Sequence, residues 1–276
     1  MVLAGGGIKG MAHIGVLKAM EEFDIPIDYV GGTSMGAMVG AGIAFGWNYE
    51  KIMELTREIA AKKPTKDYNY LPLISLLKGK QLESVLRNSF MDYRVEDCIY
   101  NYFCVSANLS NAKQVIHRKG QIFDVVRSSL SLPGIWPPKL SSMGLLVDGG
   151  IVNNFPVDIM IEAGAKTIIG IEFSGITEQK PDFEIYPSNL QLISSKVRKN
   201  KKYKRVPGLM NTIVKSALLN SDNRAKEAIE MTDIHIKPNT KKVGLMDWDA
   251  TEVAIEAGYE AAIKVFEKEW KPEKYL

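Results

Sequence analysis

Two glycine-rich turns near the start of the chain constrain its fold more than any other feature. Residues 1–4 form a short apolar stretch before GGGIKG, and residues 29–31 form another before GTSMG. A helical pattern follows each turn, with apolar side chains at helical spacing such as Ile14 and Leu17 after the first. Short strands that alternate with helices in this way are typical of a parallel sheet covered by helices. The sequence therefore predicts an α/β fold.

The rest of the chain continues this alternation. Further strands are predicted at residues 103–107, 113–117, 144–147 and 167–172, and residues 233–238 should be extended. Further helices are predicted at residues 49–61, within 71–90, and at 121–130, 209–219 and 250–269. The helix after GTSMG is rich in Gly and Ala, which predicts that a neighbouring segment packs very close to it.

The length of 276 residues suits one large domain, 1–276. We expect a catalytic core at about 1–173, an aperiodic loop at 174–206 and a helical C-terminal part at 207–276. No apolar run reaches the roughly 18 residues that a membrane span needs. No signal peptide is recognisable, so we expect a cytoplasmic protein, although the short lead-in before Gly5 leaves open a missing upstream segment.

Charge and cysteine content narrow the function classes. The net charge of +3 is too small to indicate nucleic-acid binding. Cys98 and Cys104 lack the number and spacing of a structural zinc site, and we predict that both are buried, reduced packing residues. We expect no metal and no cofactor.

The first candidate site is the loop Gly5 to Gly10. Glycine leaves the backbone amides uncovered, and the N-terminus of the following helix favours negative charge. Gly5, Gly7 and Gly10 also fit the dinucleotide fingerprint G-x-G-x-x-G. That fingerprint needs an acidic residue at the end of the second strand, whereas Asp28 precedes that strand here, so dinucleotide binding is disfavoured.

The second candidate is Ser34, flanked by Gly32 and Gly36 in a G-x-S-x-G pattern between a strand and a helix. In a nucleophile elbow, such glycines allow a strained turn that exposes the serine hydroxyl. The alternative is a serine that merely caps the helix. Its position between a strand and a Gly/Ala-rich helix favours the elbow.

A nucleophilic serine needs a base, and the chain offers histidines and one well-placed aspartate. His13, His117 and His235 lie in a predicted helix and in two extended segments, and only His235 follows the order of ordinary α/β hydrolases. Structural roles are favoured for all three. Asp148, at the end of the strand before Gly149 and Gly150, can take the serine proton directly if it lies within hydrogen-bond reach, although DG is also a common turn dipeptide.

GGGIKG, GTSMG and DGG, in that order, resemble the patatin-like phospholipases. The resemblance also covers VRSSLSLPGIWPP at 126–138 and DGGIVNNFPVDIMIEAGA at 148–165, and is greatest for the bacterial branch related to the lipase domain of neuropathy target esterase. It implies a three-layer α/β/α fold with a mostly parallel sheet. It also implies that Ser34 is the nucleophile, that Asp148 is the base and that no histidine takes part.

The same resemblance implies the remaining site residues. The oxyanion hole would consist of the amides of Gly6, Gly7 and Ile8, and Lys9 would brace the loop. The supporting glycines would be Gly5, Gly10, Gly32, Gly36, Gly149 and Gly150.

The implied activity is hydrolysis of ester bonds in phospholipids, lysophospholipids or related lipids. A transacylase with the same dyad and a lipid-binding regulatory protein with a vestigial site are the alternatives. Nothing in the sequence predicts an oligomeric state.

Two surface features bear on lipid contact. LPLISLL at Leu71 to Leu77 is either an exposed apolar wall or lid for acyl chains or a buried helix face. The stretch Lys196 to Arg205 carries seven basic residues. It could hold the protein against an anionic membrane, but a solvated loop is favoured.

Overall fold

The computed structural model describes residues 1–62, 64–90, 92–173 and 224–275, together with 185–188, 190–192, 194, 212, 216 and 219. Most of the predicted loop 174–206, the basic stretch Lys196 to Arg205 and most of the helix predicted at 209–219 lie outside these residues.

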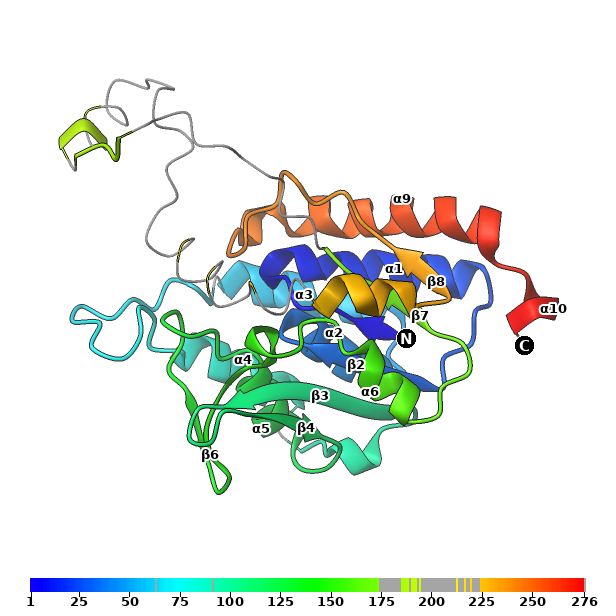
Figure 1. Ribbon diagram of the computed structural model, residues 1–276, viewed down its shortest axis with the longest axis horizontal. Coiled ribbons are helices and arrows are strands. Elements are labelled where there is room, and N and C mark those ends of the chain that lie inside the picture. The colour runs from blue at the N-terminus through cyan, green and yellow to red at the C-terminus, as the bar shows by residue number, and fades with distance from the viewer. Residues whose placement is uncertain are drawn as a thin grey trace.

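The described strands and helices follow the predicted alternation (Figure 1). The strands are β1 (Val2–Leu3), β2 (Tyr29–Thr33), β3 (Asn101–Asn108), β4 (Lys113–His117), β5 (Lys139–Ser141), β6 (Gly144–Asp148), β7 (Ile169–Ile171) and β8 (Ile234–Ile236). The α-helices are α1 (Ala12–Glu22), α2 (Met35–Ala44), α3 (Tyr49–Lys62), α4 (Lys80–Phe90), α5 (Ile122–Ser129), α6 (Val157–Glu162), α9 (Thr251–Glu269) and α10 (Pro272–Tyr275). Short 3₁₀ helices are η1 (Gly7–Met11), η2 (Val95–Asp97), η3 (Gly149–Ile151) and η5 (Trp248–Ala250).

The described strands form one sheet in the order β5-β6-β3-β2-β1-β7-β8, with β4 also paired to β3. The pairs among β3, β2, β1, β7 and β8 are parallel, whereas β4, β5 and β6 pair antiparallel. The sheet is therefore mostly parallel, as predicted. The extended segment predicted at 233–238 contains β8, so the C-terminal part supplies a sheet strand as well as the long helix α9.

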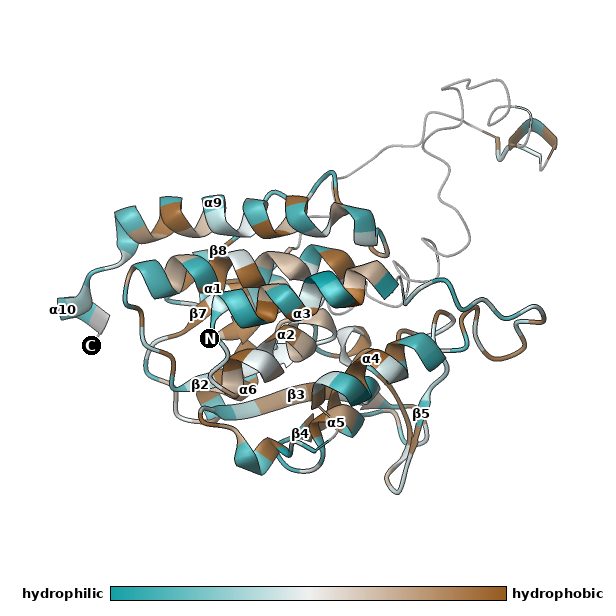
Figure 2. Cartoon of the chain, turned by 180° about the vertical axis from the view of Figure 1, so that it is seen from behind, coloured by the Kyte–Doolittle hydropathy of each residue, from teal (hydrophilic) through white to brown (hydrophobic). Residues whose placement is uncertain are grey.

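Alternate residues of the central strands enter two separate cores, because successive side chains of a strand point to opposite faces. Leu3 and Cys104 belong to the core under α1, α2 and α9. Val2 and Phe103 belong to the core on the other face, with α6 and the helical residues 224–230. In Figures 1 and 2, α9 lies along α1. This arrangement is the three-layer α/β/α fold implied by the resemblance.

Helix α2 packs directly against the backbone of β1, as its Gly and Ala content predicted. A Cβ atom at Gly36 would lie 2.2 Å from the carbonyl oxygen of Leu3. No side chain fits at that distance, so a glycine is needed where the helix crosses the strand end. This contact holds the turn around Ser34 against the sheet.

One open alternative is decided and one prediction needs correction. Of the two alternatives for Leu71 to Leu77, the buried helix face is excluded: the segment is an irregular loop with exposed apolar side chains, and the helix begins only at Lys80. Cys104 is buried, but Cys98 is only partly buried because it lies between η2 and β3 and packs against the core from outside it. Within the described residues, no helix is long and apolar enough to cross a membrane.

Candidate active site

Ser34 occupies the sharp turn between β2 and α2. Its backbone has φ +55° and ψ −123°, a conformation that costs free energy for a residue with a side chain. Ser129, at the end of α5, fixes this turn through two hydrogen bonds. The Ser34 amide donates to Ser129 Oγ at 2.8 Å, and Ser129 Oγ donates to the Val105 carbonyl at 2.6 Å. The elbow is thus tied to the central strand β3.

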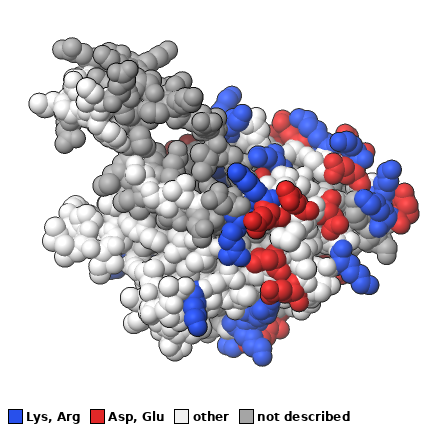
Figure 3. All heavy atoms as spheres, viewed as in Figure 1, with Lys and Arg blue, Asp and Glu red and all other residues white. Residues whose placement is uncertain are grey.

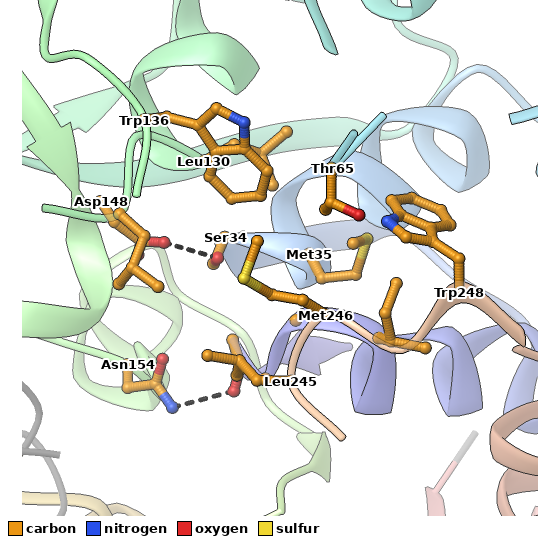
Figure 4. Close-up of a pocket in the computed structure, with 15 residues that line it drawn as sticks. Ser34, Met35, Thr65, Leu130, Trp136, Asp148, Asn154, Leu245, Met246 and Trp248 are labelled. Carbon is orange, nitrogen blue, oxygen red and sulfur yellow. Dashed lines mark hydrogen bonds between the residues drawn. The ribbon is translucent and has the colours of Figure 1, made fainter. Parts of the chain in front are cut away.

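The register of β3 brings Asp148 to this elbow. Thr33 at the end of β2 pairs with Val105, and Asp148 at the end of β6 pairs with the next residue, Ser106. Strand β4 occupies the opposite edge of β3 along residues 104–108, so β2 and β6 share one edge and meet end to end. The Ser34 hydroxyl donates to Asp148 Oδ2 at 2.6 Å (Figure 4).

Asp148 is a buried carboxyl group, with 3% of its surface exposed. Burial raises its pKa from 3.8 to about 6, because the charged form loses hydration. The hydrogen bonds that it accepts from Ser34 and from the Gly150 amide, the latter at 2.8 Å, oppose this rise. A carboxylate with a pKa near 6 is a far better proton acceptor at neutral pH than an ordinary aspartate.

The glycine loop lies beside Ser34 and is fixed by Asn154. Gly5 and Asn154 are joined by two hydrogen bonds, from the Gly5 amide to the Asn154 carbonyl at 3.2 Å and from Asn154 Nδ2 to the Gly5 carbonyl at 3.0 Å. The segment after Asp148 therefore positions the loop as well as the carboxylate. Asp28 lies at the far end of β2 from this loop, away from where a dinucleotide would need it.

Only two of the three predicted oxyanion donors are available. The Ile8 amide donates to the Leu245 carbonyl at 3.0 Å. The amides of Gly6 and Gly7 have no acceptor among the residues that the structure describes. Gly7 has φ +56°, and a Cβ there would lie 2.1 Å from the Leu245 carbonyl oxygen, so the loop needs glycine at this position.

An apolar cleft of about 580 Å³, part of it open to solvent, starts at Ser34 and Asp148. Figure 4 shows the Met246 side chain next to Ser34, with Trp136 and Trp248 on different sides of the cleft. The indole N–H groups of Trp136 and Trp248 are buried and have no acceptor in the described part of the chain. The apolar side chains that line the cleft are Ile8, Met35, Leu130, Leu132, Trp136, Leu245, Met246 and Trp248.

The hydrogen bonds of the three histidines go to groups other than Ser34 and Asp148. His13 Nε2 bonds to the Ala4 carbonyl at 2.9 Å, and His117 Nε2 bonds to Ser106 Oγ at 2.7 Å. Burial lowers the pKa of both to about 4. His235 is partly exposed on β8 and lies 3.1 Å from Glu172 Oε1. Structural roles fit these contacts.

Several residues of the cleft escaped the sequence analysis. Ser129 and Trp136 lie within VRSSLSLPGIWPP, and Asn154 lies within the segment after DGG, so the resemblance covered them without assigning them a role. Leu245 and Met246 carried no signal, because a short apolar pair far along the chain does not indicate what it packs against. Lys9 lies in η1, partly exposed. Among the described residues, no group of three His, Cys, Asp or Glu side chains could hold a metal ion.

Comparison with known proteins bears on the family and the fold of the chain. The sequence pattern of the patatin-like phospholipase family matches residues 1–161. An uncharacterised NTE family protein of Mycobacterium tuberculosis is 30% identical over 270 residues, which cover 95% of this chain and 45% of that protein. Patatin-like phospholipase domain-containing protein 6 of Mus musculus is 36% identical over 197 residues, covering 69% of this chain and 14% of that protein.

Lysophospholipase NTE1 of Kluyveromyces lactis is 28% identical over 266 residues, which cover 94% of this chain and 18% of that protein. This chain thus spans less than half the length of these relatives. The crystal structure of VipD from Legionella pneumophila has the same fold, with a TM-score of 0.51 at 15% identity, covering 96% of this chain and 66% of that one. On the match over residues 1–161, the chain belongs to the patatin-like phospholipase family.

Proposed function

We propose that the chain is a serine acyl hydrolase that cleaves ester bonds of lysophospholipids or related lipids. The observation that carries the proposal is the 2.6 Å hydrogen bond from Ser34 Oγ to Asp148 Oδ2 at the start of an apolar cleft. Family membership and the name of the Kluyveromyces lactis relative point to the same substrate class. The cleft is lined mainly by apolar side chains, which suits an acyl chain.

In the proposed reaction, Asp148 accepts the proton as Ser34 Oγ attacks the ester carbonyl. The amides of Gly6 and Gly7 stabilise the oxyanion, each worth about 2.7–4 kcal/mol by analogy with other oxyanion donors. Protonated Asp148 then donates to the leaving alcohol. Water, activated by the same carboxylate, releases the fatty acid and restores Ser34.

The acyl chain would lie along the wall made by Leu132, Trp136 and Met246. Asp148 lines the same cleft, and burial is the cause of its raised pKa. The raised pKa makes the carboxylate basic enough to act at neutral pH.

Incubation with lysophosphatidylcholine, followed by mass spectrometry of released fatty acid, tests the proposal. Ser34→Ala and Asp148→Asn should abolish release while keeping the wild-type circular dichroism spectrum. Ser128→Ala is the matched control, because its hydroxyl bonds to the Asp124 carbonyl and not to the elbow. Turnover by either site variant near the wild-type rate would refute the mechanism.

The same assay separates the alternative functions. Acyl transfer to an added lysolipid in place of fatty acid release would identify a transacylase. Failure of wild-type Ser34 to react with a fluorophosphonate probe would indicate a vestigial site.

A further inference from the structure

A surface arch formed by residues 68–77 exposes apolar side chains that the catalytic proposal does not use. Its tip is Tyr70 to Ile74, the sequence YLPLI, with no charged residue. Tyr70 is 99% exposed, and Leu71, Leu73 and Ile74 are 73%, 84% and 74% exposed. Single exposed apolar residues are common, but a contiguous group marks an interaction surface.

The arch is held in place by its base. Tyr68 and Leu77 form an antiparallel bridge, and the Asn69 amide donates to the Leu76 carbonyl at 2.8 Å. The amides of Leu76 and Leu77 donate to the carbonyls of Gly134 and Ile135, both at 2.9 Å. The exposure of the tip is thus built into the fold, because the base fixes where the tip projects.

The base of the arch packs against residues that line the cleft. Leu77 is buried against Leu132 and Ile135, and Trp136 and Met246 pack on the same small cluster. Thr65, just before the arch, also lines the cleft. Both ends of the arch therefore lie beside the proposed substrate site.

Several charged residues lie next to the arch in sequence. Lys66, Lys78 and Lys80 are exposed near its base, and Lys78 Nζ lies 5.3 Å from the centre of the Tyr70 ring. The nearby acidic group of Asp67 accepts a hydrogen bond from the Gln81 amide. In Figure 3, the side that carries the arch in Figure 1 is largely uncharged, whereas charged side chains gather over α9.

We propose that the tip Tyr70 to Ile74 inserts into the surface of a phospholipid bilayer and brings the cleft to its substrate. The apolar tip matches the acyl region, and the lysines at its base match the level of the phosphates. In Figures 1 and 2 the arch projects away from the helices and sheet, a convex shape that suits a fluid lipid surface. Lipid as the partner rests on the proposed function, but the insertion can be measured without catalysis.

The test measures co-sedimentation of the full chain, carrying Ser34→Ala, with phosphatidylcholine vesicles. The double substitution Leu73→Ser and Ile74→Ser should lower the partition coefficient at least tenfold, since each side chain contributes roughly tenfold or more when buried. The control is Ile161→Ser with Val253→Ser, two exposed apolar residues on α6 and α9. This control should bind as the parent does.

The same two double variants with Ser34 intact are assayed on a water-soluble butyrate ester. The arch variant should keep this activity while losing hydrolysis of vesicle lipid. No binding of the parent to vesicles, or equal binding of the arch and control variants, would overturn the proposal. So would a dimer of the parent that the arch substitutions dissociate, since the tip would then be a protein interface. Vesicle binding without activity on the soluble ester would refute the proposed function and leave the insertion standing.

Discussion

Asp148 is both the proposed base and a buried carboxyl group whose ionisation costs the folded state free energy. Its pKa is about 6 in the folded protein and 3.8 in the absence of burial. The folded state binds the proton of Asp148 more tightly than the unfolded state does. The contribution of Asp148 to the free energy of unfolding is therefore most favourable below pH 3.8. This contribution falls as the pH rises from about 4 to 6 and is constant at higher pH. At 1.36 kcal/mol per pH unit, the loss is about 3 kcal/mol.

Asp148→Asn removes this cost, since the amide is neutral at every pH and can still accept from the Gly150 amide. At pH 8 we expect the variant to unfold with a free energy up to about 3 kcal/mol larger than the wild type. That corresponds to a melting temperature roughly 6–10 °C higher. Near pH 4 the two proteins should be almost equally stable. The variant should at the same time lose its esterase activity, so that stability and function change in opposite directions.

Urea unfolding of both proteins at several pH values between 4 and 8 measures the effect. Asp158→Asn is the control, because that partly exposed carboxylate pairs with Arg224 at 3.0 Å and its loss should not stabilise the protein. A variant less stable than the wild type at pH 8, or a stability difference that does not change with pH, would refute the claim that burial of Asp148 raises its pKa. The wild-type kcat/KM should rise with pH through about 6 for the same reason.

Three other substitutions test the construction of the site. Ser129→Ala removes the partner of the Ser34 amide and the donor to the Val105 carbonyl, and should cost about 1–3 kcal/mol in urea unfolding and lower kcat, whereas Ser128→Ala should leave kcat unchanged. Gly7→Ala should lower kcat about 100-fold or more, because the new Cβ would collide with the Leu245 carbonyl oxygen and displace an oxyanion donor. A kcat within threefold of the wild type would argue against the Gly7 amide as an oxyanion donor. Met246→Trp should fill the cleft beside Ser34. We expect kcat/KM to fall about tenfold or more for a palmitoyl ester but little for a butyrate ester. Equal losses on both esters would mean that the acyl chain does not lie along this part of the cleft.

The opposing effects at Asp148 have a structural origin in the burial of its carboxyl group. A more hydrated carboxyl group would have a lower pKa and would destabilise the fold less, but it would be a poor base at neutral pH. The strained backbone of Ser34 also costs folding free energy, and the hydrogen bonds that Ser129 makes to Ser34 and Val105 offset this cost.

Most local features of this protein followed from its sequence, although β5 and α6 were not predicted. Strands, helices and the turn around Ser34 depend on residues within a few positions of one another, whose spacing is visible in the chain. The strand before Asp148 and the close packing of α2 were predicted for the same reason. The order of the motifs GGGIKG, GTSMG and DGG was enough to predict the fold through the family resemblance.

Only the tertiary structure shows how distant segments meet. Ser34 and Asp148 come together because β2 and β6 share one edge of β3, a pairing that no local pattern specifies. The Leu245 carbonyl accepts a hydrogen bond from the Ile8 amide, so only the Gly6 and Gly7 amides of the three predicted oxyanion donors are available. The apolar run after Leu71 projects as an arch because its base bonds to residues 134–135, a long-range contact. Periodicity along the chain reports which side chains share a face, whereas strand order and packing partners depend on contacts between segments far apart in sequence.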